Sequence, residues 1–151
     1  MIPELIDNGG LWEVLPPGEH QCSLAEIATT FGFNECRRDL LSGLEDGLEQ
    51  LSAAGCLLCF VDGSFVTGKP LPGDFDACWD HKNIDVGKLN PVFLDFSNQR
   101  AAQKSAFRGE FFPAMAQAGG GFTYIDFFQN DKSNGGTKGI LRLELPDALA
   151  A

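Results

Sequence analysis

Two carboxylates in one short segment have the spacing of a metal-binding pair. Asp74 and Asp76 are separated by Phe75 and followed by the apolar run Ala77-Cys78-Trp79. In a strand, side chains at i and i+2 project from one face, about 6.5–7 Å apart along the chain. Carboxylate oxygens suit Mg²⁺ (or Mn²⁺), and two such ions can stabilise the attacking and leaving oxygens of a nucleotidyl transfer. The pair predicts metal-dependent phosphate chemistry.

A Gly-Ser corner lies upstream of this pair. Gly63 has no Cβ, so a phosphate can approach its backbone, and the Ser64 hydroxyl and nearby N–H groups can bind it. The Gly/Pro-rich connection 67–73 can turn the chain back, so that the corner and the carboxylates face one pocket. Lys69 in this connection could neutralise a phosphate, as could Lys138, although a single loop lysine is more often solvated.

Capping residues and periodicity predict the elements around the pair. Ser23-Leu24-Ala25-Glu26 is a capping box that opens a short helix, which Gly32 can end. Asn34 caps a longer helix that runs to about Ala54, with Gly55 as its stop. Gly43 and Gly47 lie within this helix and indicate close approach to another backbone. Its apolar stripe consists of Leu40, Leu44, Leu48 and Leu51.

Shorter apolar runs predict a small mixed sheet. Residues 57–61 and 74–79 have the lengths of buried strands. We also expect a strand around 92–96, a helix around 98–107 and a hairpin of 122–128 with 139–145. The predicted fold class is α/β (α+β): one domain over 23–145, a small mixed sheet with helices packed on it. Residues 1–22 are expected to form an irregular N-terminal arm, and 146–151 a C-terminal tail.

Composition and charge exclude several classes of protein. The chain has 151 residues, 44% of them hydrophobic, and a formal net charge of -10. A fold-wide basic surface for duplex DNA or an anionic membrane is therefore ruled out, and no apolar run has the length of a membrane helix. The chain is expected to be cytoplasmic, with its five cysteines as reduced thiols. Cys56-Leu57-Leu58-Cys59 has no second pair to complete a zinc site, which favours packing.

The Gly-Ser corner followed by Asp-x-Asp resembles the nucleotidyltransferase superfamily over about residues 56–80. The longer run 62–76 resembles an uncharacterised family of small prokaryotic and phage nucleotidyltransferase-like proteins. That second resemblance spans nearly the whole chain. Its further motifs here are Leu15-Pro16-Pro17-Gly18, Leu94-Asp95-Phe96-Ser97 and Asp126-Phe127-Phe128-Gln129.

The resemblance implies Mg²⁺-dependent transfer of a nucleoside monophosphate from an NTP to an RNA end, such as that of tRNA, or to a protein hydroxyl. It assigns Gly63 and Ser64 to the triphosphate, and Asp74 and Asp76 to the metal. By analogy, small proteins of this superfamily commonly belong to toxin–antitoxin or phage-defence modules. The second hypothesis is a non-catalytic module of the same fold that binds a nucleotide or a partner protein.

This sequence departs from the superfamily pattern at two points. Asp62 stands where the pattern has an apolar residue, and it adds a negative charge near the phosphates. The third carboxylate is not fixed by spacing, and Asp126 and Asp95 compete for it. Asp126 lies in an apolar run, where a buried charge needs a partner, so we favour it as the third catalytic and metal-binding residue. Asp95 is adequately explained by a turn next to Ser97.

Two other groups of polar residues complete the candidates. Arg100, Lys104 and Arg108 recur at helical spacing as one basic stripe, either a solvated face or a site for an RNA or nucleotide phosphate. His20 and His81 have no Ser or Cys motif beside them, which argues against a hydrolase triad.

Overall fold

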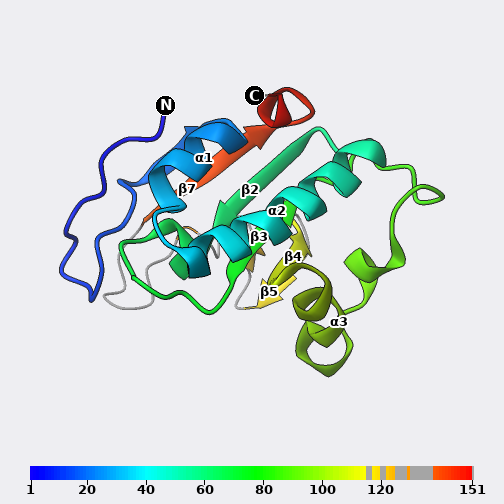
Figure 1. Cartoon of the computed structure of the whole chain (residues 1–151). Coiled ribbons are helices and arrows are strands. Elements are labelled where there is room, and N and C mark those ends of the chain that lie inside the picture. The colour runs from blue at the N-terminus through cyan, green and yellow to red at the C-terminus, as the bar shows by residue number, and fades with distance from the viewer. Residues whose placement is uncertain (115–116, 120–121, 125–128, 130–137, 151) are drawn as a thin grey trace.

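The computed structural model describes residues 1–114, 117–119, 122–124, 129 and 138–150 (Figure 1). Its helices are α1 (Leu24–Phe31), α2 (Glu35–Ala53) and α3 (Ser97–Phe107). Its strands are β1 (Gly18–Gln21), β2 (Leu58–Asp62), β3 (Phe75–Trp79), β4 (Gly109–Pro113), β5 (Gln117–Gly119), β6 (Phe122–Thr123) and β7 (Gly139–Glu144). Short 3-10 turns are η1 (Ser64–Val66), η2 (Pro91–Leu94) and η3 (Asp147–Leu149).

Five of the strands form one mixed sheet in the order β1-β7-β2-β3-β4. In the centre of the sheet, β2 is antiparallel to both of its neighbours, β7 and β3. At the two edges, β1 is parallel to β7 and β4 is parallel to β3. β5 and β6 form a separate two-stranded sheet. The protein is therefore a single mixed α+β domain, which confirms the predicted fold class.

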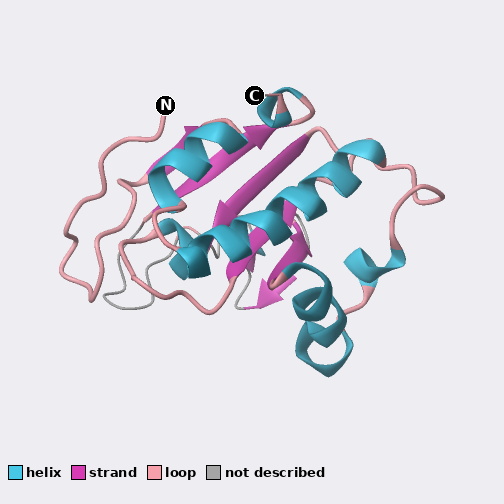
Figure 2. Ribbon diagram, in the orientation of Figure 1, coloured by secondary structure: helices cyan, strands magenta, loops and turns pink. Residues whose placement is uncertain are grey.

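α1 and α2 lie across the same face of the sheet, where the main core is buried (Figures 1 and 2). The capping box of α1 is complete, and Asn34 caps α2 by accepting from the amide of Arg37. All four leucines of the predicted stripe in α2 are at most 3% exposed. The sheet residues that meet them alternate along the strands, as in Phe75, Ala77 and Trp79 of β3. Capping residues and periodicity thus predicted α1 and α2 correctly.

The two glycines in α2 are explained by close packing. A Cβ on Gly43 would occupy the position of the Phe107 carbonyl oxygen, at the end of α3. A Cβ on Gly47 would collide with the ring of Phe111 on β4. Gly43 therefore allows the backbone approach that the sequence predicts, whereas Gly47 makes room for a side chain.

Three predictions about the elements were wrong. Residues 91–94 form the turn η2 instead of a strand, because Pro91 begins it and the Asn90 side chain caps it through the amide of Val92. The predicted arm is irregular only up to its last residues, since Gly18–Gln21 pair with β7 as β1. The expected hairpin fails because β7 lies between β1 and β2 in the sheet, while β6 pairs with β5.

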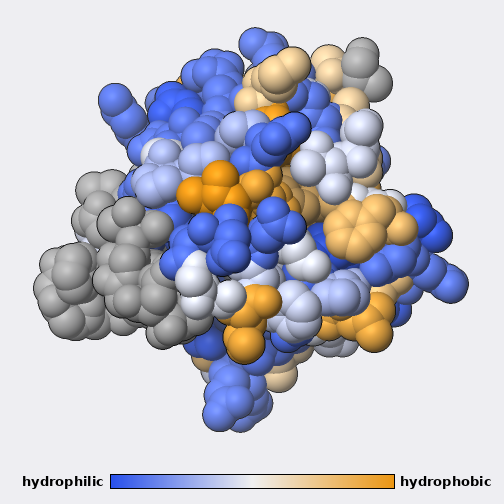
Figure 3. All heavy atoms as spheres, turned by 90° about the vertical axis from the view of Figure 1, so that its left-hand side faces the viewer, coloured by the Kyte–Doolittle hydropathy of each residue, from blue (hydrophilic) through white to orange (hydrophobic). Residues whose placement is uncertain are grey.

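The rest of the arm and the tail pack on the domain. Val14 makes bridges to Ile6 and to Thr67, which lays the arm against the loop after β2. In the predicted tail, the turn η3 buries Ala148. On the side of the arm, most of the described surface is hydrophilic, with smaller separate apolar groups (Figure 3). Within the described residues, the helices are all too short or too polar to cross a membrane.

Candidate functional site

The Gly-Ser corner, Gly63-Ser64, is a tight turn that contacts Asp76. β2 ends at Asp62, Gly63 has a φ of 87°, and η1 begins at Ser64. Side chains with a Cβ rarely adopt this conformation, which explains the glycine. A Cβ placed on Gly63 would lie 3.0 Å from Asp76 Oδ2 and 3.1 Å from the Asp76 amide nitrogen. The corner and the second carboxylate are thus in direct contact.

Three acidic residues stand side by side across neighbouring strands. Asp76 pairs with Asp62 on β2 in the antiparallel register and with Glu110 on β4 in the parallel register. Paired residues share a face, so these side chains lie on the face opposite α1 and α2. Asp74 precedes β3 by one residue and is separated from Asp76 by Phe75, which is buried in the core.

Burial and neighbouring charges raise the affinity of Asp76 and Asp74 for protons. Burial, followed by the charges of Asp74, Asp62 and Glu110, raises the pKa of Asp76 to about 7. Burial and the charge of Glu110 also raise the pKa of Asp74, although Lys104 and Lys69 act in the opposite direction. The part of each shift that comes from neighbouring negative charges would equally favour a bound cation.

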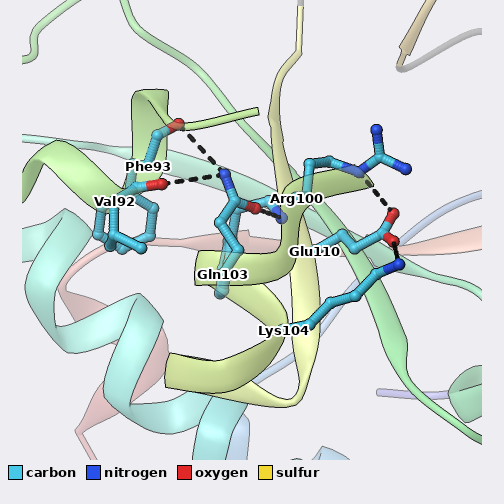
Figure 4. A network of polar contacts seen from close by, with 7 residues as sticks. Val92, Phe93, Arg100, Gln103, Lys104 and Glu110 are labelled. Carbon is cyan, nitrogen blue, oxygen red and sulfur yellow. Dashed lines mark hydrogen bonds and ion pairs between the residues drawn. The ribbon is translucent and has the colours of Figure 1, made fainter. Parts of the chain in front are cut away.

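Cations from outside the strands neutralise part of this charge. Lys138 Nζ lies 3.2 Å from Asp62 Oδ1, and both side chains are largely buried. Glu110 pairs with Arg100 Nε at 3.1 Å and with Lys104 Nζ at 3.0 Å (Figure 4). Two members of the basic stripe are therefore directed at a carboxylate instead of being simply solvated. Lys138, considered above as a phosphate ligand, pairs with Asp62.

Ser64 and Asp74 line one cavity of about 670 Å³. The cavity is also lined by three cations, Lys69, Lys104 and Arg108, and by one further carboxylate, Asp39. Two of these cations are already paired, Lys104 with Glu110 at 3.0 Å and Arg108 with Asp39 at 3.9 Å, so the cavity places cations and carboxylates together without a clear excess of either. The predicted phosphate residues Ser64 and Lys69 thus face the same space as the predicted metal ligand Asp74.

The sequence did not single out Glu110, although a signal for it exists. It lies within Gly109-Glu110-Phe111-Phe112-Pro113, a charged residue in an otherwise apolar run, which is the same pattern that favoured Asp126. Asp126 itself lies outside the described residues. Asp95 accepts from the amide and hydroxyl of Ser97, the turn role expected for it, and these bonds lower the pKa of its carboxyl.

Hard oxygen donors of the kind that Mg²⁺ prefers are present, but they do not form a ready-made cage. Within the described part of the chain, no three His, Cys, Asp or Glu side chains converge closely enough to hold a metal ion. Mg²⁺ commonly keeps several waters and completes its shell with substrate phosphates, so one or two protein carboxylates suit it. The donor set therefore fits a metal that arrives with a phosphate ligand.

The cysteines lie apart from this chemistry. All five are free thiols, and Cys56 and Cys59 are buried, with burial raising the pKa of both. Cys56 donates to the carbonyls of Leu58 and Asp80. The packing role expected for the CxxC segment matches this environment.

Comparison with known proteins places the chain in a family without giving it a reaction. Residues 11–144 match a family model described as a family of unknown function (DUF6932). Neither the curated proteins nor the solved structures include a match.

Proposed function

We propose that this chain, which belongs to the family of unknown function DUF6932, is a Mg²⁺-dependent nucleotidyltransferase. It would move a nucleoside monophosphate from an NTP to an RNA end, such as that of tRNA, or to a hydroxyl of a partner protein. The observation that carries the proposal is that Ser64 and Asp74, from the two separate motifs, line one cavity together with Lys69, Lys104 and Arg108. A cytoplasmic location and a place in a toxin–antitoxin or phage-defence module belong to the same proposal.

The cation side of the cavity suits a triphosphate. Lys69 comes from the loop after the Gly-Ser corner, whereas Lys104 and Arg108 come from α3 and its end. Ser64 can donate its hydroxyl to a phosphate oxygen between them. In a chain whose net charge is -10, the cavity gathers three cations, which a ligand that carries several negative charges could bind in place of the present carboxylate partners of Lys104 and Arg108.

The carboxylate side suits a divalent cation. Asp74 and Asp76 would hold it, and the pKa values of both are raised, first by burial and then by neighbouring carboxylates. Bound Mg²⁺ would supply electrostatic stabilisation of charge on the phosphoryl oxygens. Glu110 joins Asp126 as a candidate third carboxylate, since it is the register partner of Asp76 on the adjacent strand. The chain's own cations would bind and orient the remaining phosphates.

One observation favours the second candidate, a module that binds a nucleotide or a partner protein without catalysis. Glu110 is already neutralised by Arg100 and Lys104, and the described carboxylates do not converge into a metal cage. In such a module the same cavity would bind the nucleotide, and no transfer would follow.

Label transfer separates the candidates. The protein would be incubated with each α-labelled NTP, Mg²⁺ and total tRNA, and both RNA and protein fractions would be analysed. Transfer that is lost in Asp74→Asn and Asp76→Asn but retained in Asp95→Asn supports the transferase. Mg²⁺-dependent NTP binding in calorimetry without transfer supports the binding module. Absence of both overturns the proposed function.

A further inference from the structure

We propose that Arg37 is a positioning residue that orders the loop bearing Ser64 and Lys69, so that anion binding in the cavity depends on a side chain that does not line it. The anion-binding part of this inference rests on the proposed function. The ordering of the loop does not depend on it. Sequence reasoning gave Arg37 no role.

The contacts of Arg37 are concentrated on this loop. Arg37 lies in the first turn of α2 and is completely buried. Its guanidinium donates to the carbonyl of Phe65 at 2.6 Å and to that of Thr67 at 2.7 Å, and a further bond reaches Lys69. One more bond, of 3.2 Å, reaches Phe31 at the end of α1. Three of the four acceptors thus belong to the segment 65–69.

Thr67 connects these carbonyls to the two residues that face the cavity. Its hydroxyl donates to the carbonyl of Ser64 at 2.6 Å and accepts from the amide of Lys69 at 3.2 Å. Arg37 holds the Thr67 and Lys69 carbonyls from the other side. The chain of contacts therefore runs from α2 through Thr67 to Ser64 and Lys69, both of which line the cavity.

The charge of Arg37 gives this arrangement its strength. A buried guanidinium is costly unless its donors are bonded, and arginine stays charged even where burial lowers its pKa, as it does here. Among the described residues, no carboxylate forms an ion pair with Arg37. The loop carbonyls must therefore compensate the charge of its guanidinium. Those carbonyls converge only when the loop has this conformation. The ring centroids of Phe33 and Phe65 lie 4.4 and 5.6 Å from the guanidinium carbon.

The same turn of α2 extends the attachment along the loop. The Asn34 amide donates to the Pro70 carbonyl at 2.7 Å, and the Cys36 thiol donates to the Pro72 carbonyl at 3.5 Å. The connection between the Gly-Ser corner and Asp74 is thus fastened to the start of α2 over most of its length. A pre-ordered loop loses less conformational freedom when a ligand binds.

Hydrogen exchange and ligand binding test the inference together. Arg37→Lys keeps the charge but loses the planar fork, and Thr67→Val keeps the buried charge but removes the hydroxyl that connects Ser64 to Lys69. Arg38→Lys is the control, because Arg38 is exposed and makes one bond, to the Gly32 carbonyl. The anion probe is inorganic tripolyphosphate with Mg²⁺, measured by calorimetry. Circular dichroism shows which variants are folded.

We expect both test variants to exchange the amides of residues 67–69 about tenfold faster while the core strands stay protected. Their affinity for tripolyphosphate should fall about tenfold, and Arg38→Lys should change neither property. Unchanged exchange in folded Thr67→Val overturns the inference, as does faster exchange with full affinity. A wild-type protein that binds neither ATP nor tripolyphosphate contradicts the proposed function and the anion-binding part, while the exchange rates still decide the ordering of the loop.

Discussion

Asp62 and Asp76 stand directly opposite each other on β2 and β3, so two carboxylates share one face of the sheet at adjacent positions. Like charges in such a pair destabilise a sheet. Lys138, 3.2 Å from Asp62, neutralises one of them, but burial, followed by the charges of Asp74, Asp62 and Glu110, still raises the pKa of Asp76 to about 7. Costly arrangements of this kind are found at functional sites, and a bound cation would reduce the repulsion between the two carboxylates.

The raised pKa of Asp76 gives the stability of the protein a specific dependence on pH. The pKa of Asp76 rises from 3.8 to about 7 on folding. Asp76 therefore binds its proton more tightly in the folded state than in the unfolded state. The stabilising contribution of protonated Asp76 is therefore present below about pH 4 and is lost as the pH rises through about 7. In metal-free buffer, Asp76→Asn should be more stable than the wild type at pH 8 by about 1–3 kcal/mol, and the difference should shrink towards pH 5. Urea unfolding at several pH values measures it, with Asp95→Asn as the control. Equal or lower stability of Asp76→Asn at pH 8 would contradict the prediction.

The cations of the cavity should determine nucleotide affinity. Lys69→Ala and Lys104→Ala should each weaken Mg²⁺-ATP binding about tenfold, because each removes a positive charge from a cavity wall. Added salt should reduce the difference between wild type and variants. Lys82→Ala is the matched control, since Lys82 is exposed and lies outside the cavity. Calorimetry with ATP and GTP makes the comparison, and equal affinities for all three variants would place the nucleotide elsewhere.

Three substitutions identify the third carboxylate. If Glu110 holds the metal, Glu110→Gln should abolish Mg²⁺-dependent binding or transfer. If Asp126 holds it, Asp126→Asn should do so instead. Asp95→Asn should do neither, because Asp95 is engaged in a turn with Ser97. Circular dichroism and the label-transfer assay give the two readouts. Loss of activity in Asp95→Asn alone would reverse the assignment.

The close approach of α2 to the end of α3 predicts an unusual response to alanine. Ordinarily Gly→Ala in a helix adds about 1 kcal/mol of stability. At Gly43 the new Cβ would meet the Phe107 carbonyl oxygen, so α3 must shift, and overpacking of this kind costs about 1–3 kcal/mol. Gly43→Ala should therefore destabilise the protein, whereas Ser42→Ala, at the exposed neighbouring position, should be neutral or slightly stabilising. Thermal unfolding of both variants checks the prediction, which a higher melting temperature for Gly43→Ala would refute.

The sequence by itself determined the elements whose signals are local. The Ser23 capping box, the Asn34 cap and the leucine stripe specify α1 and α2, because caps and helical periodicity act within a few residues. Alternation likewise predicted β3, although Asp74 precedes the strand and lines the cavity, whereas Asp76 lies within the strand and is not among the lining residues. The 3-10 turn at 91–94 was missed because an apolar run of that length does not distinguish a strand from a buried turn.

Only the tertiary structure decided which distant residues meet. Strand order and register join β1 to β7 and bring Asp62 and Glu110 to the two sides of Asp76, and neither pairing has a local signature. The role of Arg37 has the same origin, since its acceptors lie up to 32 residues along the chain. The burial of apolar faces selects such contacts over the whole domain, so composition and periodicity can name the charged residues of a site but cannot place them beside one another.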